Sequence, residues 1–300
     1  MKSHTIFTKK AANLLLGLAL FASSVQAQPP GQSVPADAIV HRDLPYVTNG
    51  HERQKLDLYL PEIGNKRPLI IWIHGGAWMM GNKENAGALQ FLSEGFAVAS
   101  VNYRLSQHAI FPAQIEDCKA AVRWLRAHAG QYSLDPERFG AWGPSAGGHL
   151  VALLGTTGDT KEFEVGENLM FSSKVQAVVD FFGPTDFLEM DKQRLPDGMV
   201  HNTPDSPESR LVGGHIAGNE DKVQKANPIT YVTQSAPPFL IVHGDADPLV
   251  PHHQSELLDA SLRAAGVKVR FYTVKGGGHG QFTDPKVPEL VENFFMRHLK

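Results

Sequence analysis

The chain has 300 residues, 42% of them hydrophobic, and its 28 basic and 31 acidic residues give a net charge of −3. This balance, without a basic cluster, argues against nucleic acid as a partner, and the single cysteine, Cys118, excludes an intramolecular disulfide. The length suits one large α/β domain with an ample core, in which we expect Cys118 to be a small buried apolar group.

The N-terminus has the pattern of a secretory signal peptide. Lys2, Lys9 and Lys10 precede an apolar run over residues 11–22, and small residues follow as far as Ala27. Cleavage after Ala27 is expected. The run is about half the ~20 residues that span a bilayer, and no cysteine offers a lipoprotein anchor. We therefore expect a periplasmic or secreted product without stable membrane insertion, comprising a flexible leader over residues 28–40 and a catalytic domain over residues 41–300.

The apolar pattern predicts alternating strands and helices. Residues 55–60 alternate polar and apolar side chains, which predicts a half-buried outer strand. Continuous apolar runs at 69–73, 96–101 and 239–242 are typical of parallel strands covered on both faces. Further strands are expected at 138–144, 175–182 and 267–274, and helices at 85–94, 112–129, 146–154, 255–265 and 287–299. This alternation predicts a doubly wound, mostly parallel α/β sheet flanked by helices.

Two regions interrupt the alternation and are interpreted as insertions. Residues 156–173 and 187–230 have weak apolar periodicity and scattered Gly, Pro, Asp and Asn. The second region follows a core strand whose carboxyl end should face a site, so we expect it to form a small lid over a substrate pocket. Its candidates for substrate contact are Phe187, Leu188, Met190, Met199 and His201, although internal packing is an equal alternative for each one.

A serine stands where a strand is expected to break into a helix. Ser145 lies in the sequence Gly143-Pro144-Ser145-Ala146-Gly147, with a glycine two residues away on each side. Glycines are needed there because the entering strand and the departing helix approach too closely for side chains. The pattern predicts a nucleophile elbow, which presents a serine hydroxyl to a histidine and to backbone amides.

An acid and a histidine follow in the order that such a serine requires. Asp245 and Asp247 come after the apolar strand at 239–242, and His279 comes after the strand at 267–274 in a glycine-rich loop. We favour Asp247 as the acid because the following Pro-Leu-Val-Pro sequence would fix its loop. Asp245 would then cap the turn, and Asp186 is a third candidate.

The donors for an oxyanion are expected in the sequence from His74 to Trp78. This glycine-containing loop follows the strongly apolar strand at 69–73, where α/β-hydrolases carry their oxyanion loop. We expect the N–H groups of Gly76, Ala77 and Ala146 to serve as donors. Trp78 either lines the substrate pocket or packs beneath this loop.

Several motifs together resemble those of a known family. They are HGGAW at 74–78, VNYRLS at 101–106, FPAQIEDCK at 111–119, RWLR at 123–126, GPSAGGHL at 143–150, HGDADPLVP at 243–251 and GGGHG at 276–280. The combination resembles secreted α/β-hydrolase carboxylesterases, and the nearest group is the bacterial bifunctional feruloyl and acetyl-xylan esterases, the BD-FAE type. The resemblance covers about residue 45 to the C-terminus and is weakest in the two insertions. It implies ester hydrolysis without a cofactor, often on plant polysaccharides, by Ser145, Asp247 and His279. Pro144 is a departure, because relatives often have Glu, Asp or Ser there.

The other histidines and one ion pair are assigned structural roles. We expect His74 and His149 to support loops through hydrogen bonds, and His243 to pack at a strand end. His252 and His253 are adjacent, but no HExxH sequence or carboxylate spacing accompanies them, so we expect no metal. Arg104 and Asp117 are expected to pair near the edge of the sheet.

The sequence thus predicts a serine carboxylesterase that acts on small acyl or feruloyl esters, with a soluble ester or an acylated polysaccharide as substrate. An amidase or peptidase is an alternative because the same machinery serves it. A second alternative is a catalytically inactive hydrolase fold used as a binding module, which would usually have lost a triad residue or the oxyanion glycines.

Overall fold

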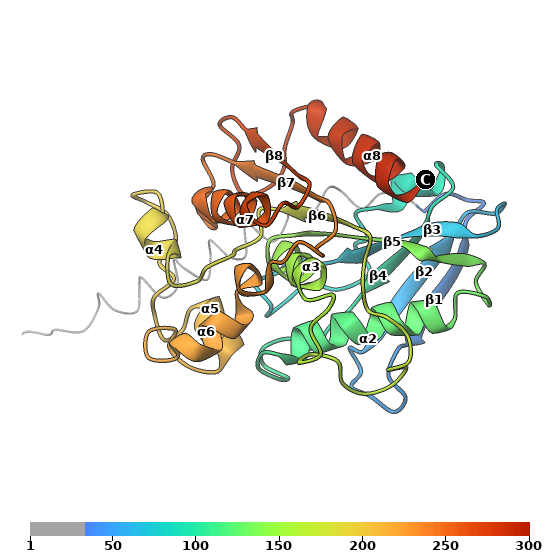
Figure 1. The fold of residues 1–300 in the computed structure, drawn as a ribbon, viewed down its shortest axis with the longest axis horizontal. Helices are drawn as coiled ribbons and strands as arrows, with labels where there is room; N and C mark the ends of the chain where they lie inside the picture. The colour runs from blue at the N-terminus through green and yellow to red at the C-terminus, as the bar shows by residue number, and fades with distance from the viewer. Residues whose placement is uncertain (1–33) are drawn as a thin grey trace, which may run out of the picture.

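Eight strands form one sheet that is sandwiched between helices (Figure 1). The computed structural model describes residues 34–300, so the predicted signal peptide and residues 28–33 lie outside the described residues. The strands are β1 (Ile39–Pro45), β2 (Lys55–Leu60), β3 (Arg67–Ile73), β4 (Ala97–Val101), β5 (Leu134–Pro144), β6 (Ala177–Phe181), β7 (Phe239–Gly244) and β8 (Val269–Val274). Their order is β1-β2-β4-β3-β5-β6-β7-β8, and β2 alone runs antiparallel to its neighbours. The predicted doubly wound, mostly parallel sheet is confirmed.

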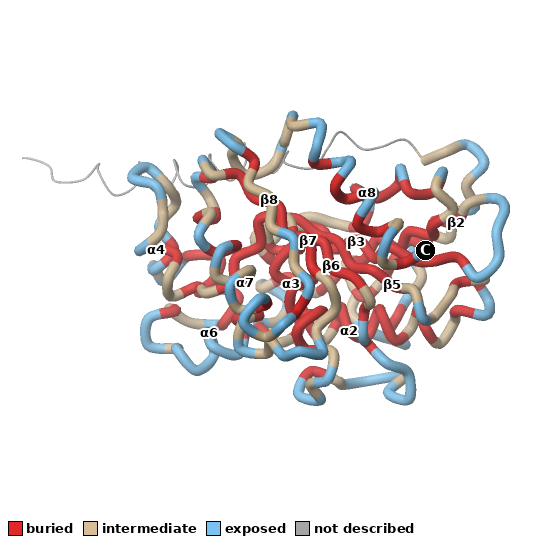
Figure 2. The backbone as a smooth tube through the Cα atoms, turned by 45° about the horizontal axis from the view of Figure 1, so that its top comes forward, coloured by how far each residue is buried: buried red, intermediate tan, exposed pale blue. Residues whose placement is uncertain are grey.

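The continuous apolar strands divide their side chains between two cores. In β3, Leu69, Ile71 and Ile73 belong to one apolar cluster, whereas Ile70 and Trp72 belong to the other. Successive side chains of a strand point to opposite faces, so a strand covered on both faces must be apolar throughout. The strands accordingly form the buried centre of the molecule in Figure 2.

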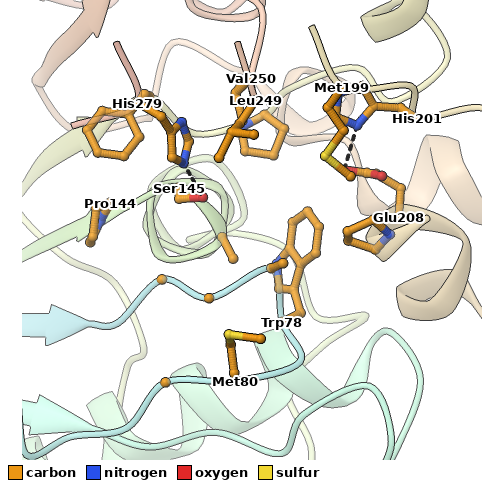
Figure 3. A pocket seen from close by; sticks show the side chains of 18 of the residues that line it. Trp78, Met80, Pro144, Ser145, Met199, His201, Glu208, Leu249, Val250 and His279 are labelled. Carbon is orange, nitrogen blue, oxygen red and sulfur yellow. Dashed lines mark hydrogen bonds and ion pairs between the residues drawn. The ribbon is translucent and has the colours of Figure 1, made fainter. Parts of the chain in front are cut away.

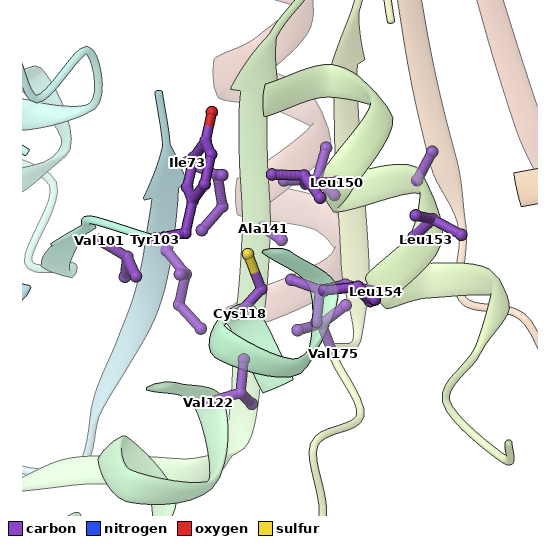
Figure 4. Packing of buried hydrophobic residues seen from close by; sticks show 14 of the residues in the cluster. Ile73, Val101, Tyr103, Cys118, Val122, Ala141, Leu150, Leu153, Leu154 and Val175 are labelled. Atoms are coloured by element: carbon purple, nitrogen blue, oxygen red, sulfur yellow. The ribbon is translucent and has the colours of Figure 1, made fainter. Parts of the chain in front are cut away.

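The helices cover the two faces in separate groups. The first core is covered by α2 (Ala113–Ala127), α3 (Ala146–Thr156) and α7 (His253–Ala264), and the second by the 3₁₀ helix η1 (Leu89–Leu92) and by α8 (Lys286–Leu299). Cys118 of α2 is fully buried as a free thiol among Val122, Ala141 and Leu154 (Figure 4), which confirms that it is a buried apolar group.

The strand at 55–60 is neither at the edge nor half-buried, so that prediction is wrong. β1 pairs with its outer side, and Leu56 to Leu60 are all buried. The polar residue Asp57 created the alternating pattern, yet it is fully buried and pairs with Lys83 at 2.8 Å and Arg42 at 3.2 Å. β1 begins at Ile39, so residues 39 and 40 of the expected leader belong to the sheet.

The helix predicted at 85–94 is also wrong, because only Leu89–Leu92 is helical, as a 3₁₀ turn. The segment packs closely around Trp72, and a Cβ on Gly87 would lie 2.4 Å from the Trp72 ring. Ala86, Ala88 and Leu89 are all buried, so the loop has no single apolar face.

The second insertion consists of short helices near the carboxyl ends of the strands (Figure 1). They are α4 (Met190–Gln193), α5 (Pro207–Val212), α6 (Glu220–Ala226) and η2 (Pro228–Tyr231). α5 begins where the Ser206 hydroxyl oxygen accepts a bond from the Ser209 N–H, and it ends at Gly213 with φ = 75°. The first insertion begins later than expected, because α3 continues through Thr156. Within residues 34–300, no helix is both long and apolar enough to cross a membrane.

Candidate active site

The predicted break from strand to helix occurs at Ser145. β5 ends at Pro144, α3 begins at Ala146, and Ser145 between them has φ = 56° and ψ = −123°. A positive φ is strained for a residue with a side chain and is held here by the surrounding structure. A Cβ on Gly143 or Gly147 would lie 2.6 or 2.1 Å from the Ile73 carbonyl oxygen. The two glycines therefore permit the close approach that the sequence predicted.

A chain of hydrogen bonds joins Ser145 to two residues from the far end of the sequence. The Ser145 hydroxyl donates to Nε2 of His279 at 3.0 Å, and Nδ1–H of His279 donates to Oδ2 of Asp247 at 2.7 Å. Ser145 follows β5, Asp247 follows β7, and His279 follows β8. The carboxyl ends of these parallel strands lie at one edge of the sheet, which brings the three residues together.

Asp247 is buried and fully hydrogen-bonded. Its Oδ1 accepts the N–H groups of Leu249 and Val250 at 2.8 and 2.9 Å, and its Oδ2 also accepts Nε2–H of His243 at 3.2 Å. Burial alone would raise the pKa of Asp247, but His279 and His243 outweigh it and lower that pKa well below its usual range. Asp247 is thus held as a carboxylate. His243 packs at a strand end as predicted, and it also anchors this acid.

The two rival carboxylates have other partners. Asp245 is partly exposed and accepts the Gly276 N–H at 2.6 Å and a bond from Lys275 at 3.0 Å, so it joins two loops. Asp186 accepts the N–H of Leu188 and the side-chain amide of Asn227. Of the three candidates, Asp247 is the one that contacts His279.

The loop after β3 lines the cavity beside Ser145. Gly76, Ala77 and Trp78 have φ values of 108°, 54° and 56°, and the Gly76 carbonyl accepts the N–H groups of Met79 and Met80. Gly76, Ala77 and Ala146 all line the same cavity as Ser145. The Ala146 N–H belongs to the first turn of α3, where N–H groups lack an acceptor within the helix.

Two buried histidines support this loop, as predicted. Nδ1–H of His74 donates to the Gly75 carbonyl at 2.7 Å, and its Nε2 accepts a bond from Arg53 at 3.2 Å. Nδ1 of His149 accepts the Trp78 indole N–H at 3.2 Å, and Nε2–H donates to the Ala226 carbonyl at 2.7 Å. Burial lowers the pKa of His74 to about 3 and that of His149 to about 4, so both rings are neutral at pH 7.

The expected pair of Arg104 and Asp117 is present, although Arg104 follows β4, which is an internal strand of the sheet. The guanidinium of Arg104 contacts the buried Asp117 carboxylate at 2.8 Å, and the Arg104 backbone N–H donates to it as well. The adjacent His252 and His253 contact neighbouring side chains. His252 stacks on Phe271, His253 contacts Glu256, and residues 34–300 contain no group of three metal-ligating side chains.

Ser145 opens into a cavity of about 270 Å³ (Figure 3). This volume is slightly below the range of clefts that bind drug-sized ligands. Trp78 lines the cavity, as one of its two interpretations predicted, and its buried indole N–H donates to His149. The insertion contributes Met199 and His201, as two of its candidates predicted.

Phe187 and Leu188 do not line the cavity, so their prediction as pocket residues is corrected. The Phe187 ring is buried behind Trp78, with ring centres 5.5 Å apart, and Leu188 packs against the first core. Met190 is fully buried and likewise lies outside the cavity wall. Cavity residues that the sequence analysis missed include Met80, Asn82, Asn85, Phe182, Glu208 and Leu249. Leu249 could have been predicted as a cavity residue, because it is two residues from Asp247 in the same loop.

The fold and the serine-centred site define an α/β-hydrolase. The BD-FAE family model matches residues 56–262, and the chain belongs to this family. Two curated relatives come from Mycobacterium tuberculosis. Esterase LipQ is 31% identical over 80% of this chain and 56% of its own length. The probable carboxylic ester hydrolase LipM is 35% identical over 65% of this chain and 45% of its own length. The chain spans about half the length of these relatives.

Two solved structures resemble the chain over most of its length. A truncated form of a carbohydrate esterase from gut microbiota is 36% identical, with a TM-score of 0.83 over 90% of this chain and 99% of that one. A butyrate-bound esterase from Thermogutta terrifontis is 25% identical, with a TM-score of 0.68 over 87% and 94% of the two chains.

Proposed function

We propose that the protein is a serine carboxylic-ester hydrolase with Ser145 as nucleophile, His279 as general base and acid, and Asp247 as the residue that orients His279. The observation that carries this proposal is the hydrogen-bonded chain from the Ser145 hydroxyl through His279 to the buried Asp247 carboxylate. The relatives named esterases support the same chemistry.

The first half of the reaction forms an acyl-enzyme. Ser145 Oγ attacks the ester carbonyl carbon while Nε2 of His279 takes its proton. The tetrahedral intermediate collapses when the C–O bond to the alcohol breaks and His279 gives that proton to the departing oxygen. Water then attacks the acyl-enzyme with the same base, and the carboxylic acid and free Ser145 are released.

Backbone N–H groups would stabilise the negative charge of both intermediates. Gly76, Ala77 and Ala146 supply them at the cavity wall beside Ser145. Such donors are fixed by the fold before the charge appears, and the loss of one typically costs ~3 kcal/mol of barrier. Pro144 lies beside Ser145 at the end of β5, and its lack of an N–H removes no donor from this set.

The proposed substrates are esters of small acyl groups or of feruloyl groups, including those attached to polysaccharides. The modest cavity supports a small acyl group, as does the butyrate-bound structural relative. A carbohydrate esterase among the similar structures supports a sugar-linked ester. We further propose that the protein acts in the periplasm or outside the cell after cleavage behind Ala27, which the N-terminal pattern supports.

The test compares the wild type with Ser145→Ala on p-nitrophenyl acetate and butyrate. We expect the wild type to hydrolyse both esters and Ser145→Ala to lose at least about 10⁴-fold in kcat. Ser93→Ala, at an exposed position, is the matched control and should retain full activity. A fluorophosphonate probe should label the wild type but not Ser145→Ala.

Three results would contradict the proposal. Equal hydrolysis by the wild type and Ser145→Ala would exclude Ser145 as the nucleophile. An unlabelled, inactive wild type would indicate a binding module. Faster cleavage of p-nitroanilides than of matched p-nitrophenyl esters would indicate an amidase.

A further inference from the structure

Arg53 holds both ends of the loop after β3, at His74 and at Gly81. Nη2 of Arg53, two residues before β2, donates to Nε2 of His74 at 3.2 Å and to the Gly81 carbonyl at 2.9 Å. Its Nε donates to the Tyr103 carbonyl at 2.8 Å. A guanidinium is planar and its N–H directions are fixed, so the bond to Tyr103 directs Nη2 at the two ends of the loop.

The partners of the His74 ring leave it a single tautomer. The Gly75 carbonyl, 2.7 Å from Nδ1, can only accept a hydrogen bond, and the Arg53 guanidinium can only donate one. Nδ1 therefore carries the ring proton, and Nε2 accepts the bond from Arg53. Burial, and to a smaller extent the charge of Arg53, lowers the pKa of His74 to about 3, so the ring stays neutral.

The bond from His74 to Gly75 sets the direction of one expected oxyanion donor. The Gly75 carbonyl and the Gly76 N–H belong to one planar trans peptide, in which C=O and N–H point in opposite directions. Holding the carbonyl against the His74 ring therefore points the Gly76 N–H away from that ring. Because both residues are glycines, no side chain restricts the rotation of this peptide, and its orientation depends on such a bond.

This peptide lies beside the nucleophile. A Cβ on Gly75 would be 2.9 Å from the Pro144 carbonyl oxygen and 3.4 Å from Cβ of Ser145. Gly76 lines the same cavity as Ser145. A rotation of the Gly75–Gly76 peptide would therefore change which polar group faces the substrate.

We propose that Arg53 is a positioning residue for the oxyanion site, because it selects the tautomer of His74 that holds the Gly75–Gly76 peptide. This inference rests on the proposed function, in which the Gly76 N–H stabilises a negatively charged oxygen. Without Arg53, His74 would be free to carry its proton on Nε2. Its Nδ1 would then turn a lone pair toward the Gly75 carbonyl, and the peptide would lose the bond that orients it.

The test measures how well the enzyme binds an oxyanion. Ser145 Oγ adds to the carbonyl carbon of a trifluoromethyl ketone while His279 takes its proton, and the ketone oxygen becomes an oxyanion. A methyl ketone with the same alkyl chain occupies the cavity without this addition. The ratio of the two inhibition constants reports the oxyanion site, and it does not depend on the fraction of folded enzyme.

Arg53→Met removes the donated bonds at similar side-chain length. We expect its preference for the trifluoromethyl ketone to be about tenfold or more below that of the wild type, because the loss of one oxyanion donor typically lowers kcat by about 10²–10³. The KM for p-nitrophenyl acetate should change far less than kcat. The Lys83 N–H still donates to Oδ1 of Asn102 at 2.7 Å, so the far end of the loop keeps an anchor.

Arg138→Met is the matched control. Arg138 also donates to two backbone carbonyls, those of Lys66 at 2.7 Å and Leu299 at 3.3 Å, and it pairs with Asp135. It lies in the first half of β5, whereas Ser145 follows the end of that strand. This variant should lower the free energy of unfolding but keep the inhibition ratio within about twofold of the wild type.

A measurement on the wild type decides the first step even if Arg53→Met does not fold. NMR of ¹⁵N-labelled histidine, with His74 assigned through His74→Asn, should show its proton on Nδ1. A proton on Nε2 of wild-type His74 would overturn the inference.

The inference is also overturned if Arg53→Met keeps the wild-type inhibition ratio, or if Arg138→Met loses as much of it. Either result, together with hydrolysis of p-nitrophenyl acetate that depends on Ser145, would remove this inference alone. A wild type that binds both ketones equally, or hydrolysis that does not depend on Ser145, would remove the proposed function as well.

Discussion

Replacing Asp247 by Asn tests how His279 is oriented. Oδ2 of Asp247 accepts hydrogen bonds from His279 at 2.7 Å and His243 at 3.2 Å, while Oδ1 accepts the N–H groups of Leu249 and Val250. Asn keeps an oxygen for the two backbone donors, so its NH₂ group takes the place of Oδ2. An NH₂ group cannot accept Nδ1–H, and His279 would adopt the tautomer that carries its proton on Nε2.

That tautomer cannot take the proton of Ser145. A histidine held in the wrong tautomer typically lowers kcat about 10⁴-fold, which corresponds to about 5.4 kcal/mol of barrier at ~1.36 kcal/mol per tenfold change. Because Oδ1 keeps both backbone bonds, the loop should remain folded, and the KM for p-nitrophenyl acetate should change far less than kcat.

Asp245→Asn is the matched control, because Asp245 lies in the same loop but contacts Gly276 and Lys275. We expect it to keep kcat within about twofold of the wild type in the same assay at pH 7. The reasoning is refuted if Asp247→Asn retains more than a tenth of the wild-type kcat, or if Asp245→Asn loses as much as Asp247→Asn.

Two further predictions concern stability. Gly147→Ala places a Cβ 2.1 Å from the Ile73 carbonyl oxygen, so we expect urea unfolding to show a loss of about 3 kcal/mol in the free energy of unfolding. The Cβ of the control Gly130→Ala meets nothing within 4 Å, and this variant should change the free energy of unfolding by less than about 1 kcal/mol. Equal effects of the two substitutions would contradict the close packing of Gly147. Burial lowers the pKa of His149 to about 4, so the unfolded chain binds more protons between about pH 4 and its ordinary pKa of 6.5. Stability should therefore fall with decreasing pH in that window by up to about 1.4 kcal/mol per unit from this residue, and His149→Gln should show a correspondingly shallower slope in urea unfolding at pH 6 and pH 5.

The sequence was sufficient to predict the centre of the fold and the residues around Ser145. Strands covered on both faces must be apolar throughout, so β3, β4 and β7 were visible as short apolar runs. Ser145, Asp247 and His279 each follow a strand, and parallel strands bring their carboxyl ends to one edge. These predictions depend on local pattern and on one topological rule.

The predictions that failed depend on which segments meet in space. The strand at 55–60 was predicted to be half-buried, but β1 covers its outer side, and Lys83 and Arg42 pair with its buried Asp57. Phe187 was a candidate for the pocket wall, with internal packing as the equal alternative, and it packs behind Trp78. Lys83 and Arg42 are more than ten positions away from Asp57, and Trp78 is more than ten positions away from Phe187, and no local pattern records such contacts.

The two ends of the cavity are built by parts of the chain with different tolerance to change. The Ser145 end is made by β5, α3 and the loop after β3, where a single added Cβ at Gly147 would overlap the backbone. The other end, at Glu208, is made by α5, whose start is capped by Ser206, and by the preceding loop with Met199 and His201. We therefore expect substitutions there to change contacts with a bound substrate without moving Ser145. Specificity can therefore diverge among such hydrolases while the reaction is retained, and this explains why the reaction was easier to predict from the sequence than the substrate.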